Sequence, residues 1–170
     1  REVRPHARQW DEAERFPHEL VPKLAELGLL GIRIPEEYGG AAMDTLSYAI
    51  CVEECARVDG SLALTVASHN GLGTSHILSF GSDAQKRKYL PRLARGEISA
   101  FALTEPDVGS DPARMGTVAT PTEDGKAFIL NGDKQWCTNV TDPKTTLIAV
   151  LARTPDKELP NGKKIPQISC

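Results

Sequence analysis

"GEISAFALTEPDVGSDP", residues 96–112, separates two parts of the chain whose apolar residues follow different periods. Before it, apolar residues recur at three- and four-residue intervals, which is typical of helices. After Ile98 the sequence alternates between apolar and polar residues, which is typical of strands. The change predicts an α+β fold, with an all-α bundle over residues 1–97 followed by a β domain over residues 98–170. We expect the β domain to be an incomplete antiparallel sheet or barrel without a parallel βαβ unit.

Capping residues mark the helices of the first part. Side chains that can accept hydrogen bonds from first-turn N–H groups precede three apolar stretches, at Asp44, Ser61 and Ser82. Gln85 can complete a capping box with Ser82. The apolar residues of the helix over residues 44–59 lie on more than one face, which predicts an interior helix. Pro91 has no N–H group and predicts a break or kink in the last helix.

Turn residues divide the second part into strands. Asp124-Gly125 and Asn131-Gly132 are strong signals for two-residue hairpin turns, because both central residues of such turns need a positive φ. "TTLIAVLAR", residues 145–153, predicts one further strand. "TPDKELPNGKKIP", residues 154–166, predicts a long polar loop before another strand begins at Ile165.

Charge and composition exclude several classes of partner. The 170 residues carry a net charge of −3, and the pI is near 5.8. Nucleic acids and anionic membranes bind basic surfaces, so neither is an expected partner. No apolar run predicts a transmembrane helix, and "REVRPHARQW" lacks the apolar segment of a signal peptide. The chain stops at Cys170 within an alternating pattern, so we interpret it as a piece of a longer protein.

The cysteines and histidines do not have the spacing of a metal site, and we predict none. We expect reduced, buried thiols, which fit a cytosol-like compartment. "GLGTSH", residues 71–76, is not a dinucleotide fingerprint, because His76 replaces the last glycine and no strand precedes it. His69 and His76 are predicted to be core or interface residues, and no two carboxylates form a convincing acid–base dyad.

The polar loop over residues 103–112 is a candidate binding site. It offers hydroxyls and a series of backbone N–H groups that suit a phosphate or the edge of a polar heterocycle, contributed by Thr104, Val108, Gly109 and Ser110. "WCTN", residues 136–139, adds a flat aromatic face and a hydroxyl. An equally simple interpretation is an Asx-type turn at Asp107 or Asp111 and a core tryptophan.

"ALTEPDVGSD" and "LNGDKQWCTN" resemble the acyl-CoA dehydrogenase family of flavoproteins. "ELGLLGIRIPEEYGG", "CARVDGSLAL" and "HNGLGTSHILSFGSDAQKRKYLPRLARGE" extend the resemblance, in family order, over nearly the whole chain. Val108 and Arg114 stand where the family usually has small residues, and Cys137 replaces a more usual isoleucine. The resemblance implies an N-terminal helical domain and part of the middle β domain, truncated before a C-terminal helical domain.

The resemblance implies that the loop after the first strand holds FAD. The cofactor-binding residues carried over are Phe101, Ala102, Leu103, Thr104, Gly109, Ser110, Trp136, Cys137 and Thr138. Thr104 is expected near the pyrimidine edge of the flavin, and Ser110 beside the pyrophosphate and the substrate. Trp136 is expected to flank the isoalloxazine ring, with the Thr138 hydroxyl near N5.

The family reaction is α,β-dehydrogenation of an acyl-CoA thioester. A glutamate removes the α-proton, the β-hydrogen leaves as hydride to the flavin, and an electron-transferring flavoprotein accepts the electrons. The resemblance assigns that glutamate to the C-terminal domain, so no catalytic residue is expected within residues 1–170. It also implies a homo-oligomeric parent in the bacterial cytoplasm or the mitochondrial matrix.

Two other functions fit the same residues. One is a superfamily relative that uses the flavin site on a substrate without CoA. The other is a non-enzymatic protein that binds flavin or acyl-CoA in an assembly.

Overall fold

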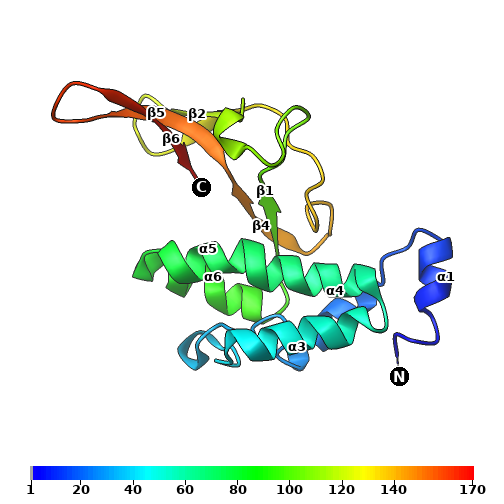
Figure 1. Cartoon of the computed structure of the whole chain (residues 1–170). Helices are drawn as coiled ribbons and strands as arrows, with labels where there is room; N and C mark the ends of the chain where they lie inside the picture. The colour runs from blue at the N-terminus through cyan, green and yellow to red at the C-terminus, as the bar shows by residue number, and fades with distance from the viewer. Residues whose placement is uncertain (1) are drawn as a thin grey trace. The chain divides into compact units, whose positions relative to one another are not determined.

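The computed structural model describes residues 2–170, and the chain forms two compact units. The first unit is the chain up to Ala100 together with Thr138–Ile148, and the second is Phe101–Cys137 together with Ala149–Cys170. Helices precede strands along the chain, which confirms the predicted α+β fold class (Figure 1). The proposed domain boundary between residues 97 and 98 stays a prediction.

The first unit contains the helices. In chain order they are α1 (Ala7–Glu12), η1 (His18–Leu20), α2 (Val21–Glu26), η2 (Glu36–Tyr38), α3 (Thr45–Ala56), α4 (Gly60–Ala67), η3 (Ser68–Gly73), α5 (Thr74–Phe80) and α6 (Asp83–Ala94). η3 is a π-helical segment between α4 and α5, and η1 and η2 are short 3₁₀ helices. No helix in residues 2–170 is long and apolar enough to cross a membrane.

The helix caps were predicted with one error. The Asp44 carboxylate accepts a hydrogen bond from the Ser47 N–H at 2.8 Å, and Ser82 forms both halves of a capping box with Gln85, so both predictions are confirmed. The prediction for Ser61 is wrong. Asp59, two residues earlier, caps α4 and accepts from the Leu62 N–H at 2.7 Å. A carboxylate is a strong acceptor for first-turn N–H groups, so the helix begins at the earlier residue.

The break predicted at Pro91 does not occur, because α6 runs unbroken from Asp83 to Ala94. The interior position predicted for α3 is also wrong, since none of its residues is buried. Tyr48 and Cys51 face the rest of the unit, whereas Leu46 and Ile50, on another face, are 66% and 51% exposed. Only one apolar face of the helix is therefore packed.

Two apolar clusters form the core of the first unit. The larger contains Trp10, Leu20, Val21, Leu24, Leu30, Leu62, Val66 and Ile98, and the smaller contains Ile34, Leu90, Leu93 and Ala94. Ile98 brings the start of β1 (Ile98–Ala102) into the larger cluster. The first residues of the strand are therefore held by the helices.

The remaining strands are β2 (Val118–Pro121), β3 (Phe128–Asn131), β4 (Thr145–Val150), β5 (Ala152–Glu158) and β6 (Lys164–Ser169). β1 pairs with β4, and the other four form a sheet in the order β3-β2-β5-β6. The β2–β3 and β5–β6 pairs are antiparallel, but β2 and β5 are parallel at Val118 and Arg153, which corrects the purely antiparallel prediction. β3 and β4, rather than an α-helix, lie between β2 and β5 in the chain, so the two parallel strands do not form a βαβ unit. Residues 2–170 contain no closed barrel.

The two predicted hairpin turns have different outcomes. Gly125 lies in the β2–β3 turn with φ of 65°, but the Thr122 N–H donates to the Ala127 carbonyl, so four residues rather than two form the loop. Asn131-Gly132 ends β3 and forms no hairpin. A Cβ at Gly132 would lie 2.5 Å from the Thr117 side chain, so close packing explains this glycine.

The segment predicted as one strand and a polar loop is instead two strands and a hairpin. Leu151 separates β4 from β5, and residues 154–158 belong to β5. The register of β5 against β6 shifts between Thr154 and Lys157, next to Pro155. β6 is exposed along its whole length and β5 is buried only at Ala152, so the pair has no continuous buried face that would produce apolar alternation.

Candidate functional site

A tight turn forms the first half of the loop that follows β1. The Glu105 N–H donates to the Val108 carbonyl at 2.9 Å, and the Val108 N–H donates back to the Glu105 carbonyl at 3.1 Å. Val108 is also buried. Its N–H group is therefore satisfied within the loop, contrary to our expectation that it would face a ligand.

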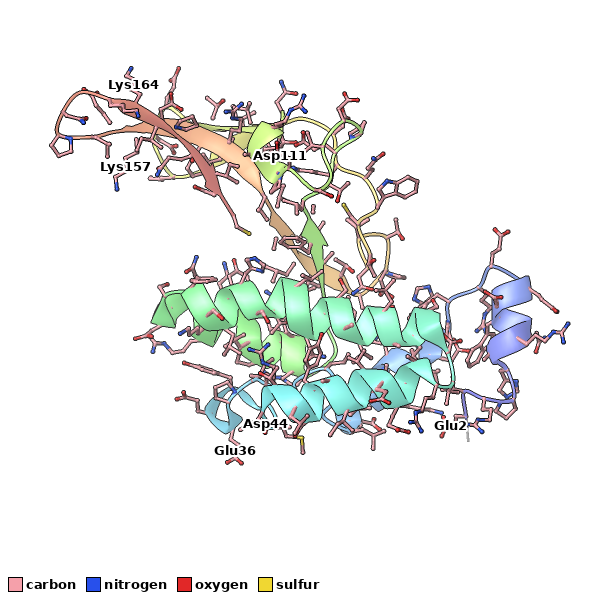
Figure 2. The ribbon with its side chains drawn as sticks, viewed as in Figure 1. Glu2, Glu36, Asp44, Asp111, Lys157 and Lys164 are labelled. Carbon is pink, nitrogen blue, oxygen red and sulfur yellow. The ribbon has the colours of Figure 1, made fainter. Side chains whose placement is uncertain are left out.

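The second half of the loop is open. Gly109 and Ser110 are exposed, and a Cβ built on Gly109 would meet no atom within 4 Å. Within residues 2–170, the N–H groups of these two residues have no hydrogen-bond acceptor. Asp111 lies just before the short helix η4 (Pro112–Arg114) (Figure 2). In the described part of the chain neither Asp107 nor Asp111 bonds the backbone through its carboxylate, so an Asx turn does not explain the loop.

Glu105 is a buried carboxylate that the sequence analysis missed. It accepts hydrogen bonds from the Gly116 N–H at 2.6 Å, the Thr117 N–H at 2.9 Å and the Lys134 ammonium at 2.8 Å. Burial acts to raise the pKa of Glu105, but these donors outweigh it and lower the pKa to about 2. The carboxylate is therefore ionised at neutral pH and holds the loop against the start of β2.

Lys134 and Gln135 tie the second predicted motif to the first. The Lys134 ammonium also donates to the Leu103 carbonyl at 2.9 Å. The Gln135 backbone N–H donates to the Thr104 carbonyl at 2.9 Å, and its side chain donates to the Glu105 carbonyl at 3.1 Å. Residues 103–105 and 134–135 are thus held together within the second unit. The structure brings together the two motifs that the sequence suggested.

Trp136 follows this anchored pair and is exposed. Its side chain is 83% exposed and its backbone has φ of 57°, a left-handed conformation that residues other than glycine and asparagine adopt rarely. The interpretation of Trp136 as a core residue is therefore wrong. Strained backbone of this kind is concentrated at binding and active sites. Cys137 is half-buried, and its Sγ lies 3.5 Å from the Gln135 carbonyl.

The other predicted residues differ in what they can offer a ligand. Ala102 is buried, and its carbonyl accepts from the Leu151 N–H at 3.0 Å. Phe101, Leu103 and Thr104 are half-buried. Thr138 is also half-buried and belongs to the first unit.

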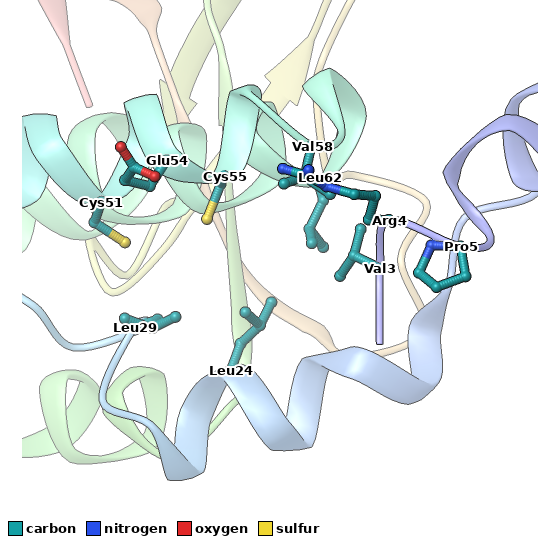
Figure 3. Close-up of a pocket in the computed structure, with 10 residues that line it drawn as sticks. All are labelled: Val3, Arg4, Pro5, Leu24, Leu29, Cys51, Glu54, Cys55, Val58 and Leu62. Carbon is teal, nitrogen blue, oxygen red and sulfur yellow. The ribbon is translucent and has the colours of Figure 1, made fainter. Parts of the chain in front are cut away.

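A separate cavity of about 830 Å³ lies in the first unit and contains none of the predicted site residues (Figure 3). It is lined by Val3, Arg4, Pro5, Leu24, Leu29, Cys51, Glu54, Cys55, Val58 and Leu62. Burial raises the pKa of the Cys51 thiol to about 11, so this group is protonated at neutral pH. In residues 2–170 no three acidic, cysteine or histidine side chains are grouped as metal ligands.

His69 is a core residue, as predicted from the apolar stretch around it. Its ring is fully buried, with Nε2 2.8 Å from the Leu30 carbonyl and Nδ1 3.1 Å from the Ser99 N–H. Because Nδ1 accepts from a backbone N–H, the ring proton lies on Nε2 and is donated to Leu30. Burial lowers the pKa of His69 to about 4, so the ring is neutral at physiological pH.

Two family models match the chain. Family models match at residues 1–97, described as "Acyl-CoA dehydrogenase, N-terminal domain", and at residues 100–166, described as "Acyl-CoA dehydrogenase, middle domain". "Probable acyl-CoA dehydrogenase FadE10" of Mycobacterium tuberculosis is 46% identical over 151 residues, which are 87% of this chain and 23% of that protein.

Solved structures of acyl-CoA dehydrogenases share the fold. Butyryl-CoA dehydrogenase from Megasphaera elsdenii is 35% identical with a TM-score of 0.85, over 99% of this chain and 44% of that one. Acyl-CoA dehydrogenase complexed with FAD from Bacillus anthracis is 38% identical with a TM-score of 0.81, over 99% of this chain and 28% of that one. The chain thus spans less than half the length of each of these proteins. With the N-terminal family model covering more than half of its residues, the chain belongs to the acyl-CoA dehydrogenase family.

Proposed function

We propose that residues 1–170 are part of a longer FAD-dependent acyl-CoA dehydrogenase that catalyses α,β-dehydrogenation of acyl-CoA thioesters. The observation that carries this proposal is the arrangement of residues 102–111 and 130–137, the parts of the two family motifs that lie in the second unit. Lys134 and Gln135 bind residues 103–105, and the open backbone at Gly109 and the exposed ring of Trp136 belong to the same two motifs.

The residues fit the two chemically different ends of FAD. An isoalloxazine ring needs a flat apolar neighbour, and Trp136 presents an aromatic side chain that the chain itself leaves 83% exposed. A pyrophosphate needs N–H donors that have no other acceptor and space for close approach. The backbone at Gly109 and Ser110 meets both requirements within the described residues.

When bound, FAD supplies the acceptor for the β-hydrogen. In our proposal Phe101, Ala102, Leu103 and Thr104 lie along the flavin with Trp136 and Cys137, and the Thr138 hydroxyl donates a hydrogen bond near N5. Ser110 contacts the pyrophosphate and the acyl-CoA. The protein orients the substrate and excludes water from the reacting carbons. We place the catalytic base outside residues 1–170, and propose an electron-transferring flavoprotein as acceptor and a homo-oligomeric parent in the bacterial cytoplasm or the mitochondrial matrix.

Replacing Trp136 with alanine in the full-length polypeptide tests the proposal. The exposed side chain contributes little to folding, so we expect unchanged stability but weaker FAD binding and lower acyl-CoA turnover. Phe128→Ala is the matched control, because Phe128 is an exposed aromatic residue of the same unit, 56% exposed on β3. Retained FAD affinity and turnover in the Trp136 variant would contradict the proposed site.

A further inference from the structure

We propose that Asn139 is a positioning residue that fixes the Thr138 hydroxyl for its contact with the flavin. This inference rests on the proposed function, because that function gives Thr138 its role. It concerns a residue to which neither the family resemblance nor the cofactor contacts above assign a function.

The backbone of Asn139 reverses the chain immediately after Thr138. Its φ is 72°, in the left-handed region, which asparagine tolerates better than most residues with a Cβ. The Asn139 carbonyl accepts from the Asp142 N–H at 3.1 Å and from the Thr145 hydroxyl. The conformation on the C-terminal side of Thr138 is therefore fixed by hydrogen bonds as well as by backbone preference.

The side chain of Asn139 anchors this turn to two buried elements. Its amide nitrogen donates to the Ser99 carbonyl on β1 at 3.2 Å and to the Thr65 carbonyl on α4 at 3.3 Å. Both acceptors are carbonyls, so the amide must present its NH₂ group to them. Thr65 lies near the junction of α4 with the π-helical segment η3, and segments of this kind are frequent at functional sites.

The Ser99 carbonyl that Asn139 binds belongs to a buried polar network. Ser99 is fully buried, and its N–H donates to His69 while its carbonyl accepts from Asn139. The Ser99 hydroxyl lies 3.1 Å from the His69 carbonyl and 3.2 Å from the Thr74 hydroxyl. Side chains bind both backbone groups of Ser99, so Asn139 is joined to a buried, hydrogen-bonded part of the core.

A position with the same chemistry provides a control. Asn70 is buried, and its amide donates to the Leu29 carbonyl at 2.9 Å and to the Val66 carbonyl at 3.0 Å. Asn70 therefore also bridges two carbonyls in the first unit, but it is not adjacent in sequence to a proposed flavin contact. Loss of its amide should lower stability without a specific effect on the flavin.

The test uses the full-length flavoprotein and a double-mutant cycle. Asn139→Gly keeps the left-handed backbone but removes the amide, and Asn139→Asp keeps the size but turns a donor into an acceptor. We expect each to weaken FAD binding by about 10-fold, which corresponds to the loss of the one hydrogen bond between the Thr138 hydroxyl and the flavin. We also expect each to lower kcat more than it changes KM. In a Thr138→Val background, Asn139→Gly should cause no further loss, because the hydroxyl that it positions is gone.

Two results would overturn the inference. One is an equal loss of FAD affinity from Asn139→Gly with and without Thr138→Val, which would show that Asn139 acts independently of Thr138. The other is the same loss of affinity and kcat from Asn70→Asp, which would reduce the effect to general destabilisation. A wild-type protein that binds no FAD would remove the proposed function as well, so the two failures are distinguishable.

Discussion

Replacing Glu105 with glutamine tests whether the buried carboxylate organises the loop. The substitution keeps the shape of the side chain but removes the charge that faces Lys134. The Lys134 side chain is only 11% exposed, so its ammonium would be left buried without a carboxylate partner. A buried charge without a partner is costly, and Gly116 and Thr117 would also lose a charged acceptor.

The magnitude follows from the pKa. Lowering the pKa of Glu105 from 4.5 to about 2 corresponds to about 3 kcal/mol of stability at neutral pH. A carboxylate whose pKa is lowered in the folded state stabilises the protein at pH values above the pKa that the carboxylate has in the unfolded chain. The difference between wild type and Glu105→Gln should therefore be complete at neutral pH and should disappear as the pH falls from about 4.5 to about 2.

Hydrogen exchange at the Gly116 and Thr117 amides measures this effect directly, because both donate to the carboxylate. We expect protection to fall by roughly a factor of 100 in Glu105→Gln. Glu123→Gln, at an exposed position of the same unit, is the control for the change in net charge. Glu105→Gln combined with Lys134→Met should recover part of the stability, since no charge is then left without a partner.

Unchanged protection of the two amides in Glu105→Gln would refute this reasoning. Equal effects of Glu105→Gln and Glu123→Gln would refute it too, because the exposed carboxylate has no such partners to lose.

Three further predictions concern the flavin contacts and the core histidine. Thr138→Val in the full-length protein should cost about 1–2 kcal/mol of FAD binding, measured by titration, because it removes one hydrogen-bonding hydroxyl; unchanged affinity, reduction potential and turnover together would show that Thr138 does not contact the flavin. Gly109→Val should leave thermal unfolding unchanged but weaken FAD binding, since the space beside Gly109 is open and its φ is not positive; equal FAD affinity would remove the pyrophosphate from this loop. As the pH falls from about 6.5 to about 4, the free energy of unfolding of the wild type should fall by about 3 kcal/mol relative to that of His69→Gln, because only the unfolded chain binds a proton in that range. Parallel pH profiles of urea unfolding for the two proteins would contradict this prediction.

Local signals predicted the helix boundaries well because a cap acts over three residues. Asp44 and Ser82 both bind the N–H group three positions later, which the sequence alone makes plausible. Ser61 was a wrong choice between two good caps, since Asp59 stands two residues before it. The strand content of residues 154–158 was missed because an exposed hairpin does not need alternating apolar residues.

Long-range contacts explain what the sequence could not predict at the site. Glu105 and Lys134 are 29 positions apart, and Asn139 binds carbonyls 40 and 74 positions away. No local period connects such residues. The motifs themselves were found from the residue types that they carry, but the use of the Val108 N–H within the loop depends on a turn that only the structure reveals.

The most direct test of the proposal that the catalytic base lies outside residues 1–170 is to compare dye reduction by the full-length polypeptide with dye reduction by residues 1–170. Each is given excess FAD and a series of short to long acyl-CoAs. The full-length protein should bind FAD and reduce the dye with at least one acyl-CoA. Residues 1–170 alone should be nearly colourless, self-associate and reduce no dye, because part of a cofactor site buries too little of the ligand and an unpaired sheet edge tends to pair with another chain. Turnover by residues 1–170 alone would mean that they contain the catalytic base. A full-length protein that binds FAD but reduces no dye with any acyl-CoA would contradict the proposed reaction.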